Sequence, residues 1–455
     1  MTMACLVFLA SILYAVLTAR ALYDDGSYYF MRVLAAGGFT EMLFTRGHAA
    51  FLFQLPVVIA LKCGIRDLTQ LQLAFGLGCF CAWPVAMVVC LRLAPKHFWL
   101  VALACGAGYL NAAFVAVGEH VVAHAFFWPV VFVLLFVRPL TPGAAVVLLL
   151  SLVILVRSYE TMLFLAPPLA WLAWRRARTA EIPWQRIVFL LTIFFLLASI
   201  LIAVDGTLHP CTLSSTNSFK IGVLSVLASP GWTIGWTAAW LALLLACFFA
   251  KFRQMLSWRS SWLLLAGIIL LWGAWPLLSP ASLYPYKQYE ARFLDLIVPL
   301  GLLVVAWMLA NRPAWLEAQR KQLVHLSAAL LLAQSLWHLG ATEQWRGYLN
   351  VWRHLVTTLK GLVDLTATDY WRQPAVGRQA TRFVWEMDAR DLAIEIGPRH
   401  VQALLLPGVT ESGEVVHITL LNQFTSAELP DLARYGVDYT AYLAALDAAK
   451  KNPPP

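Results

Sequence analysis

The sequence predicts an all-α polytopic membrane protein with about eleven transmembrane helices and a small α+β C-terminal domain outside the membrane. Three observations predict it. The chain is 61% hydrophobic and 13% charged, a balance outside the range of soluble globular proteins. Apolar segments of roughly 17 to 25 residues, each able to cross about 30 Å of hydrocarbon, recur as far as residue 341. Beyond that point the composition changes, and residues 342–455 carry 13 of the 24 acidic residues.

Eleven segments are predicted to cross the membrane. They are 3–22, 68–91, 98–117, 121–138, 143–156, 160–174, 184–204, 232–250, 262–278, 293–310 and 322–341. The first resembles a signal peptide, but it lacks a basic start and its apolar run is longer than usual, so we interpret it as a retained anchor helix. The stretch 49–61 contains Pro56 and is short for a crossing, so we interpret it as a re-entrant or interfacial helix.

Loop charges set the predicted orientation. With the amino terminus inside, the cytoplasmic loops hold thirteen basic residues and two acidic ones, whereas the outer side of the membrane region holds nine of each. The positive-inside rule predicts this asymmetry, and a crossing by 49–61 would invert it. The run Arg175-Arg176-x-Arg178 is interpreted as a topology signal only. We therefore expect an inner (plasma) membrane protein with a cytoplasmic N-terminus and an extracytoplasmic, periplasmic C-terminal domain.

The chain is predicted to divide into a membrane domain and a C-terminal domain. The ranges are 1–341 for the membrane domain, with outer loops 23–48, 205–231 and 279–292, and 342–455 for the C-terminal domain. In the first loop, residues 28–43 are predicted to form a surface helix. At 344–363, Trp345, Leu349 and Trp352 recur at helical spacing among basic residues, which is typical of a helix lying on a bilayer. Short apolar runs at 401–406 and 415–421 are candidate strands.

An acidic pair follows the first span directly, in Tyr23-Asp24-Asp25-Gly26-Ser27-Tyr28-Tyr29. Carboxylates beside lipid are costly unless they meet a cation, a metal ion or a reacting group. Asp and Gly also favour turns, so a solvated turn is the alternative interpretation. On this pair alone both interpretations stay open.

Other isolated polar residues fall on the same side of the predicted membrane. They are Arg46, His48, Glu119, His120, His124, Arg157, Tyr159, Glu160, Lys287, Glu290 and Arg292. A carboxylate can take a proton from an attacking hydroxyl or amine, and Arg or Lys can hold an anionic leaving group. Both kinds of group at one membrane surface indicate a lipid-anchored phosphate substrate.

With these motifs the chain resembles the GT-C superfamily of integral-membrane glycosyltransferases, which use polyprenyl-phosphate-linked sugars. That family typically has an acidic pair, often Asp-Glu followed by Tyr, where this chain has Asp24 and Asp25. Its His-Pro-Pro helix start is similar to Arg46-Gly47-His48, although both prolines are absent here. Glu119 matches a second acidic position, and the stretch from Arg292 to Pro299 is similar to an Arg-Tyr-Leu-x-x-Pro motif, with Asp295 as a departure. The resemblance covers most of residues 1–310.

The resemblance implies an enzyme that moves a sugar, a hexose or pentose, from a polyprenyl-phosphate donor to an acceptor on the outer face of the membrane. The acceptor is a lipid, a glycan or a protein, and no nucleic-acid partner is expected. The implied catalytic residues are Asp24, Asp25 and Glu119. The same three would be the oxygen ligands if a divalent cation, Mg²⁺ or Mn²⁺, is used. The implied substrate-binding residues are Arg292, Lys287, Arg157, His48, Tyr28 and Glu160.

Two other function classes stay open. One is a transporter or flippase of lipid-linked saccharides, and the other is a non-catalytic membrane scaffold that presents residues 342–455. Transporters usually show internal repeats and broken helices with polar groups near the bilayer midplane. In this sequence the polar residues favour helix ends, and we find no repeat.

Overall fold

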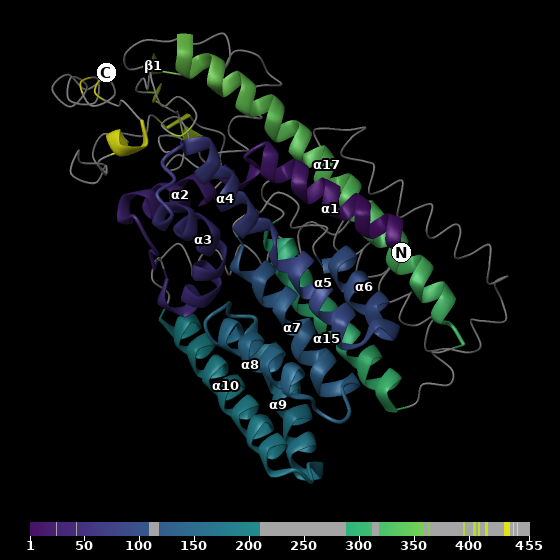
Figure 1. Ribbon diagram of the computed structural model, residues 1–455. Helices are drawn as coiled ribbons and strands as arrows, with labels where there is room; N and C mark the ends of the chain where they lie inside the picture. The colour runs from purple at the N-terminus through teal and green to yellow at the C-terminus, as the bar shows by residue number, and fades with distance from the viewer. Residues whose placement is uncertain are drawn as a thin grey trace.

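The computed structural model describes residues 1–209, apart from 24, 42 and 109–117, together with 288–311, 318–358 and short C-terminal pieces (Figure 1). Those pieces are 363–364, 395, 404–405, 408–409, 415–416, 432–436, 440 and 444. Several sequence predictions therefore lie wholly or largely outside the described residues: Asp24, Lys287, the spans 232–250 and 262–278, the outer loops 205–231 and 279–292, and most of the C-terminal domain 342–455. The side chains of Asp25 and Arg292 lie outside them too.

The described part of the chain is helical apart from four two-residue strands. Its α-helices are α1 (Thr2–Leu17), α2 (Asp25–Ala36), α3 (Gly47–Lys62), α4 (Leu68–Phe80), α5 (Ala82–Leu93), α6 (Phe98–Gly108), α7 (Glu119–Phe136), α8 (Pro142–Val156), α9 (Met162–Thr179), α10 (Pro183–Leu208), α15 (Gln288–Asn311) and α17 (Arg320–Thr358). Short 3₁₀ helices are η1 (Arg20–Leu22), η2 (Phe44–Arg46), η3 (Pro95–His97) and η9 (Leu432–Tyr435). Strand β1 (Val363–Asp364) pairs in parallel with β2 (Leu404–Leu405), and β3 (Gly408–Val409) pairs antiparallel with β4 (Val415–Val416).

Four of the described helices are long and apolar enough to cross a membrane, and a fifth crossing results if α4 and α5 form one span. The four are η2 with α3 (Phe44–Lys62), α7, α10 and the Arg320–His354 part of α17. Helices α4 and α5 are bent by 50° at the break between them. The chain thus has the helices of a multi-pass membrane protein. The segment around 49–61 is longer than predicted, because its helix begins earlier in the loop; eleven crossings and the orientation stay predictions.

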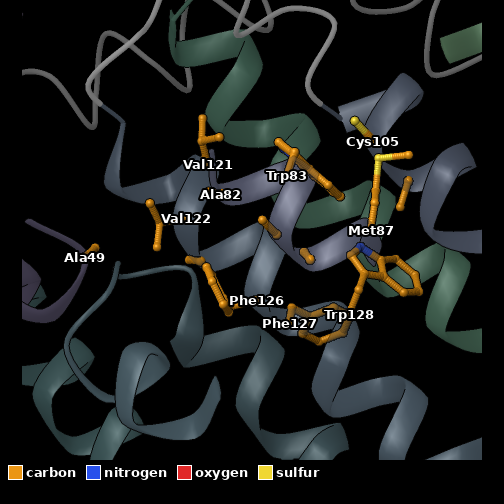
Figure 2. Packing of buried hydrophobic residues seen from close by; sticks show 14 of the residues in the cluster. Ala49, Ala82, Trp83, Met87, Cys105, Val121, Val122, Phe126, Phe127 and Trp128 are labelled. Atoms are coloured by element: carbon orange, nitrogen blue, oxygen red, sulfur yellow. The ribbon is translucent and has the colours of Figure 1, made fainter. Parts of the chain in front are cut away.

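Helix α7 lies at the centre of the bundle. All of its residues from Glu119 to Leu135 are buried, and α3, α5, α6, α8, α9 and α15 contact it. Its Phe126 and Trp128 belong to the same buried cluster as Trp83 and Met87 of α5 (Figure 2). A helix that is apolar all round is buried in a protein core or spans a membrane, and here other helices cover it. The surface left for lipid is on outer helices such as α10, which exposes a row of leucine, isoleucine and phenylalanine side chains.

Helices α2, α3 and α4 gather beyond the Glu119 end of α7 (Figure 1). The sequence predicted a surface helix over 28–43, and that prediction is wrong in burial and extent. The helix is α2, and Phe30, Val33 and Leu34 on it are at most 1% exposed. The Phe30 ring packs 5.4 Å from the ring of Phe75 on α4. A neighbouring helix thus covers the apolar face of the helix that the sequence predicts to lie on the surface.

Helix α17 is unbroken over 39 residues and lies along α1 (Figure 1). The sequence predicted that it ends near residue 341 and is followed by a separate helix on the bilayer surface, which is wrong. Trp345, Leu349 and Trp352 are buried inside the protein, and the Trp345 indole donates a hydrogen bond to the Thr18 carbonyl at 3.2 Å. The apolar face has a partner in α1, which composition alone does not reveal. The predicted domain boundary falls inside this continuous helix.

Part of the C-terminal region returns to the end of α2. Arg434 Nη2 donates to the carbonyl oxygens of Leu34 at 2.7 Å and Ala35 at 3.3 Å, and the Tyr435 hydroxyl donates to Leu34 at 3.0 Å. The last carbonyls of a helix have no partner within the helix. Arg434 and Tyr435 therefore cap α2 from 400 residues further along the chain.

The contact between α3 and α4 depends on a glycine. A Cβ atom at Gly78 would lie 1.8 Å from the Phe53 carbonyl oxygen, so the two backbones must separate to admit one. Gly78→Ala is expected to lower the free energy of unfolding by about 1–3 kcal/mol, as overpacking does. Thermal unfolding of the purified protein in detergent measures this. The control is Gly347→Ala on α17, where nothing lies within 4 Å and alanine favours the helix. An unchanged midpoint for Gly78→Ala would contradict the close packing.

Candidate functional site

Three charged side chains from separate connections meet at the N-terminal end of α7. Arg46 ends η2, Glu119 begins α7, and Glu160 precedes α9. Arg46 Nε donates to Glu160 Oε1 at 3.0 Å, and Arg46 Nη2 lies 2.9 Å from the same oxygen. Arg46 Nη1 lies 3.8 Å from Glu119 Oε2. The sequence placed these residues on one side of the membrane, and the structure brings them into contact.

Glu119 holds a fixed position in this cluster. It is the first residue of α7, where a carboxylate interacts favourably with the helix dipole, and it is only 7% exposed. Its Oε1 accepts a hydrogen bond from the Tyr29 hydroxyl at 3.0 Å, while Oε2 faces Arg46. Because both carboxylate oxygens have partners, Glu119 links α2 to the loop before α3.

An aromatic ring covers one side of the Arg46 guanidinium. Its central carbon lies 4.7 Å from the centroid of the Tyr159 ring, and the His120 ring lies 5.5 Å from that same ring. A guanidinium over a tyrosine face is stabilised by the ring quadrupole. Arg46 keeps only about a fifth of its side chain exposed (21%). Its charge is therefore confined between two carboxylates and an aromatic face.

Arg157 holds the loop that carries Arg46. Its guanidinium pairs with Glu41, donates to the Phe44 carbonyl and lies 4.0 Å from the Phe44 ring centroid. Its carbonyl oxygen accepts from the His48 amide at 3.1 Å. A Cβ on Gly47 would lie 2.6 Å from Arg157 Nη2, so a larger residue there would displace the guanidinium. Partial burial lowers the pKa of the Arg157 guanidinium below its ordinary value.

His48 and Tyr28, both predicted to bind substrate, lie beside this cluster with other partners. His48 Nδ1 lies 2.5 Å from the Val153 carbonyl oxygen of α8. The Tyr28 ring lies 5.1 Å from the Arg32 guanidinium, and it is the neighbouring Tyr29 that reaches Glu119. Tyr29 was missed because the sequence cannot tell which of two adjacent tyrosines faces α7.

Of the acidic pair, the structure describes only the backbone of Asp25. Asp25 is the first residue of this helix, and Tyr29 follows one turn later, about 6 Å along the axis. Arg292 lies in the first two turns of α15. Tyr29 thus connects the backbone at Asp25 to the cluster. That Asp24, Asp25 and Arg292 lie together stays a prediction.

The described carboxylates of this cluster do not form a metal site. Among the described residues no group of three or more His, Cys, Asp or Glu side chains is placed to hold an ion. Glu119 and Glu160 both face Arg46, and a divalent cation on either would be repelled by that guanidinium. A cation site would have to be built mainly from the acidic pair.

No known protein helps to identify the function. No protein-family model matches the sequence, and neither the curated proteins nor the solved structures give a match.

Arg20 is a buried cation that the sequence analysis did not single out. It is 0% exposed at the junction of α1 and α17. Its Nη1 donates to Thr342 Oγ1 at 3.0 Å and to the His338 carbonyl at 3.3 Å, and the guanidinium lies 5.5 Å from the Phe80 ring centroid. Arg20 lies about one helical turn before the acidic pair in the sequence. These hydrogen bonds therefore hold the start of the segment that contains the acidic pair. The sequence signal that could have identified Arg20 is its position as an ionisable residue at the end of an apolar span.

Proposed function

We propose that the protein is a membrane glycosyltransferase that moves a sugar from a polyprenyl-phosphate donor to an acceptor on the outer face of the membrane. One observation carries the proposal: the chain of contacts Tyr29–Glu119–Arg46–Glu160. It ties the helix that begins at Asp25 to the N-terminal ends of α7 and α9. These contacts hold the backbone at Asp25, the first residue of α2, near these helix ends, and a general base needs such a fixed support.

In the proposed reaction an acceptor hydroxyl or amine attacks the anomeric carbon of the sugar. Asp24 or Asp25 takes the proton of the attacking group, and the bond from the sugar to the phosphate oxygen breaks as polyprenyl phosphate leaves. Glu119 and Arg46 position α2 through Tyr29.

The charges of the side chains assign the donor and the acceptor to different places in this scheme. The described cluster holds one positive charge, on Arg46, against two negative charges, on Glu119 and Glu160. Such a cluster repels a phosphate and suits a neutral or amine acceptor. The donor phosphate is therefore assigned to Lys287 and Arg292, the cations before and within the first turns of α15.

The test is a transfer assay with the full chain purified into lipid nanodiscs. Fluorescent polyprenyl-phosphate sugars are supplied with lipid, glycan and peptide acceptors, and release of polyprenyl phosphate is measured. Glu119→Gln keeps an acceptor for Tyr29 but loses the charge facing Arg46. It is expected to lower turnover roughly 10²-fold by misplacing α2. The matched control is Glu343→Gln on α17, whose carboxylate pairs with Arg346 on the surface. Wild-type turnover in Glu119→Gln would contradict the proposed role, and no transfer by the wild type to any acceptor would reject the enzyme.

A transporter of lipid-linked saccharides is the second candidate, and two observations favour it. Helices α4 and α5 form a bent pair, as discontinuous helices of transporters do. Helix α17 also carries a buried polar row inside its apolar part: Ser327, Gln334, Ser335, His338 and Thr342. In vesicles, movement of an unchanged lipid-linked sugar between leaflets would favour this function over transfer.

A further inference from the structure

A second polar site lies at the opposite end of the bundle from Glu119. It is a cavity of about 340 Å³ between the ends of α7, α9 and α15 and the start of α10. Among the described residues that line it are three arginines, Arg138, Arg175 and Arg176, and one acidic residue, Glu181. In this described lining positive charge is in excess by two, so the cavity favours an anion.

Arg176 is built into the wall of this cavity. Its Nη1 donates to the Leu134 carbonyl at 3.3 Å and its Nη2 to the Val137 carbonyl at 2.9 Å, and it lies 5.0 Å from the Phe189 ring centroid. Carbonyl groups orient a guanidinium without neutralising its charge. The arginine is thus held rigidly between α7, α9 and α10 with its positive charge available to a ligand.

The cavity lies at the level of a lipid headgroup layer. Helix α7 has 18 residues, so its two ends are about 26 Å apart, close to the roughly 30 Å thickness of the hydrocarbon core. Tryptophans mark the same level: Trp171 and Trp174 of α9 are each 46% exposed, and Trp184 of α10 and Trp307 of α15 are each 38% exposed. Exposed tryptophans gather where a membrane meets water. This end of α9 and α10 is at the bottom of Figure 1.

We infer that this cavity binds the phosphate of an anionic membrane lipid. The arginines hold the headgroup, and the acyl chains lie along the exposed apolar face of α10, which includes Ile187, Leu190 and Leu191. Basic cavities between membrane helices at the headgroup level bind such lipids. The Arg175-Arg176 pair is then a ligand site as well as a topology signal. The inference is independent of sugar transfer, because it rests on the other end of the bundle.

The test measures lipid binding to the full chain in detergent by native mass spectrometry, with phosphatidylglycerol as the probe. Arg138→Gln/Arg175→Gln removes two lining charges and leaves Arg176 to its carbonyl contacts. Binding is expected to weaken about fivefold per arginine, or roughly 25-fold in the double variant. The matched control is Arg178→Gln/Arg186→Gln, two exposed arginines at the same level that do not line the cavity. Their loss is expected to leave the affinity within about twofold of the wild type, because surface charges contribute little.

Three results would overturn the inference. They are unchanged affinity in the lining variant, an equal loss in the control variant, and equal binding of zwitterionic phosphatidylcholine. Displacement of the lipid by an equal concentration of inorganic phosphate would reassign the cavity to a soluble anion and overturn the lipid assignment. The unfolding midpoint in lipid-free detergent checks that each variant folds. If the double variant does not fold, Arg138→Gln alone has to show the fivefold loss.

Discussion

Arg46→Ala is expected to lower the free energy of unfolding by about 2–3 kcal/mol and to reduce sugar transfer at least tenfold. Breaking a buried ion pair costs about 3–5 kcal/mol, because it leaves an uncompensated charge. We place the value lower because Arg46 is 21% exposed and water screens what remains. Without the guanidinium, Glu119 and Glu160 repel one another and Tyr29 loses its fixed acceptor. Chemical unfolding in detergent and the transfer assay measure the two effects.

A matched control and a double variant make this prediction specific. Arg32→Ala removes an exposed arginine from α2 and is expected to change stability by no more than about 0.5 kcal/mol. Adding Glu160→Gln to Arg46→Ala removes one of the two repelling charges, so the double variant should be more stable than the sum of the single effects predicts. Strict additivity, or equal losses in Arg46→Ala and Arg32→Ala, would show that Arg46 does not hold the cluster together.

The largest effect on activity is expected from the acidic pair. Asparagine has the size and hydrogen-bonding capacity of aspartate but cannot accept a proton. If Asp25 is the general base, Asp25→Asn should reduce turnover by roughly 10²–10⁴-fold with unchanged unfolding behaviour. Asp24→Asn, assayed separately, decides which of the two residues takes the proton. Transfer from a fluorescent polyprenyl-phosphate sugar is the measurement.

The same pair of variants separates the alternatives for these acids. If the pair binds a cation, excess Mn²⁺ should restore part of the activity of the asparagine variants. If the pair only forms a turn, asparagine serves equally well and both variants should keep full activity. That result would contradict a catalytic role for these acids. Asp67→Asn is the control for the chemical change, since Asp67 caps α4 by accepting from the Gln70 amide at 2.8 Å and asparagine caps equally well.

The convergence of Arg46, Glu119 and Glu160 could be predicted from the sequence. Charged residues in apolar chains concentrate at helix ends, and counting the apolar segments places those ends on one side or the other. The helix positions followed from the same apolar runs. Individual partners could not be predicted, because the spacing along the chain does not show that Arg46 pairs with Glu160 or that Arg157 holds Glu41.

The errors share one physical origin. An amphipathic pattern shows that a helix has an apolar face, but the pattern is the same whether lipid or another helix covers it. Trp345 and Trp352 therefore suggested a membrane surface although α1 and its neighbours bury them. The buried contacts of Arg20 with Thr342 join residues 322 positions apart, and no local signal specifies such a contact.

The capping of α2 by Arg434 and Tyr435 has a consequence for how the protein is made. The Leu34 carbonyl has a local partner in the Gly37 amide at 3.3 Å, but Arg434 and Tyr435, which complete the cap, leave the ribosome 400 residues later, about 20–80 s at ordinary rates of synthesis. During that interval the helix that begins at Asp25 lacks part of its support. A chain that ends before Arg434 would insert most of its apolar helices and would still lack the cap on α2. Completion of synthesis and assembly of the site are therefore coupled, so that incomplete chains carry an unfinished α2.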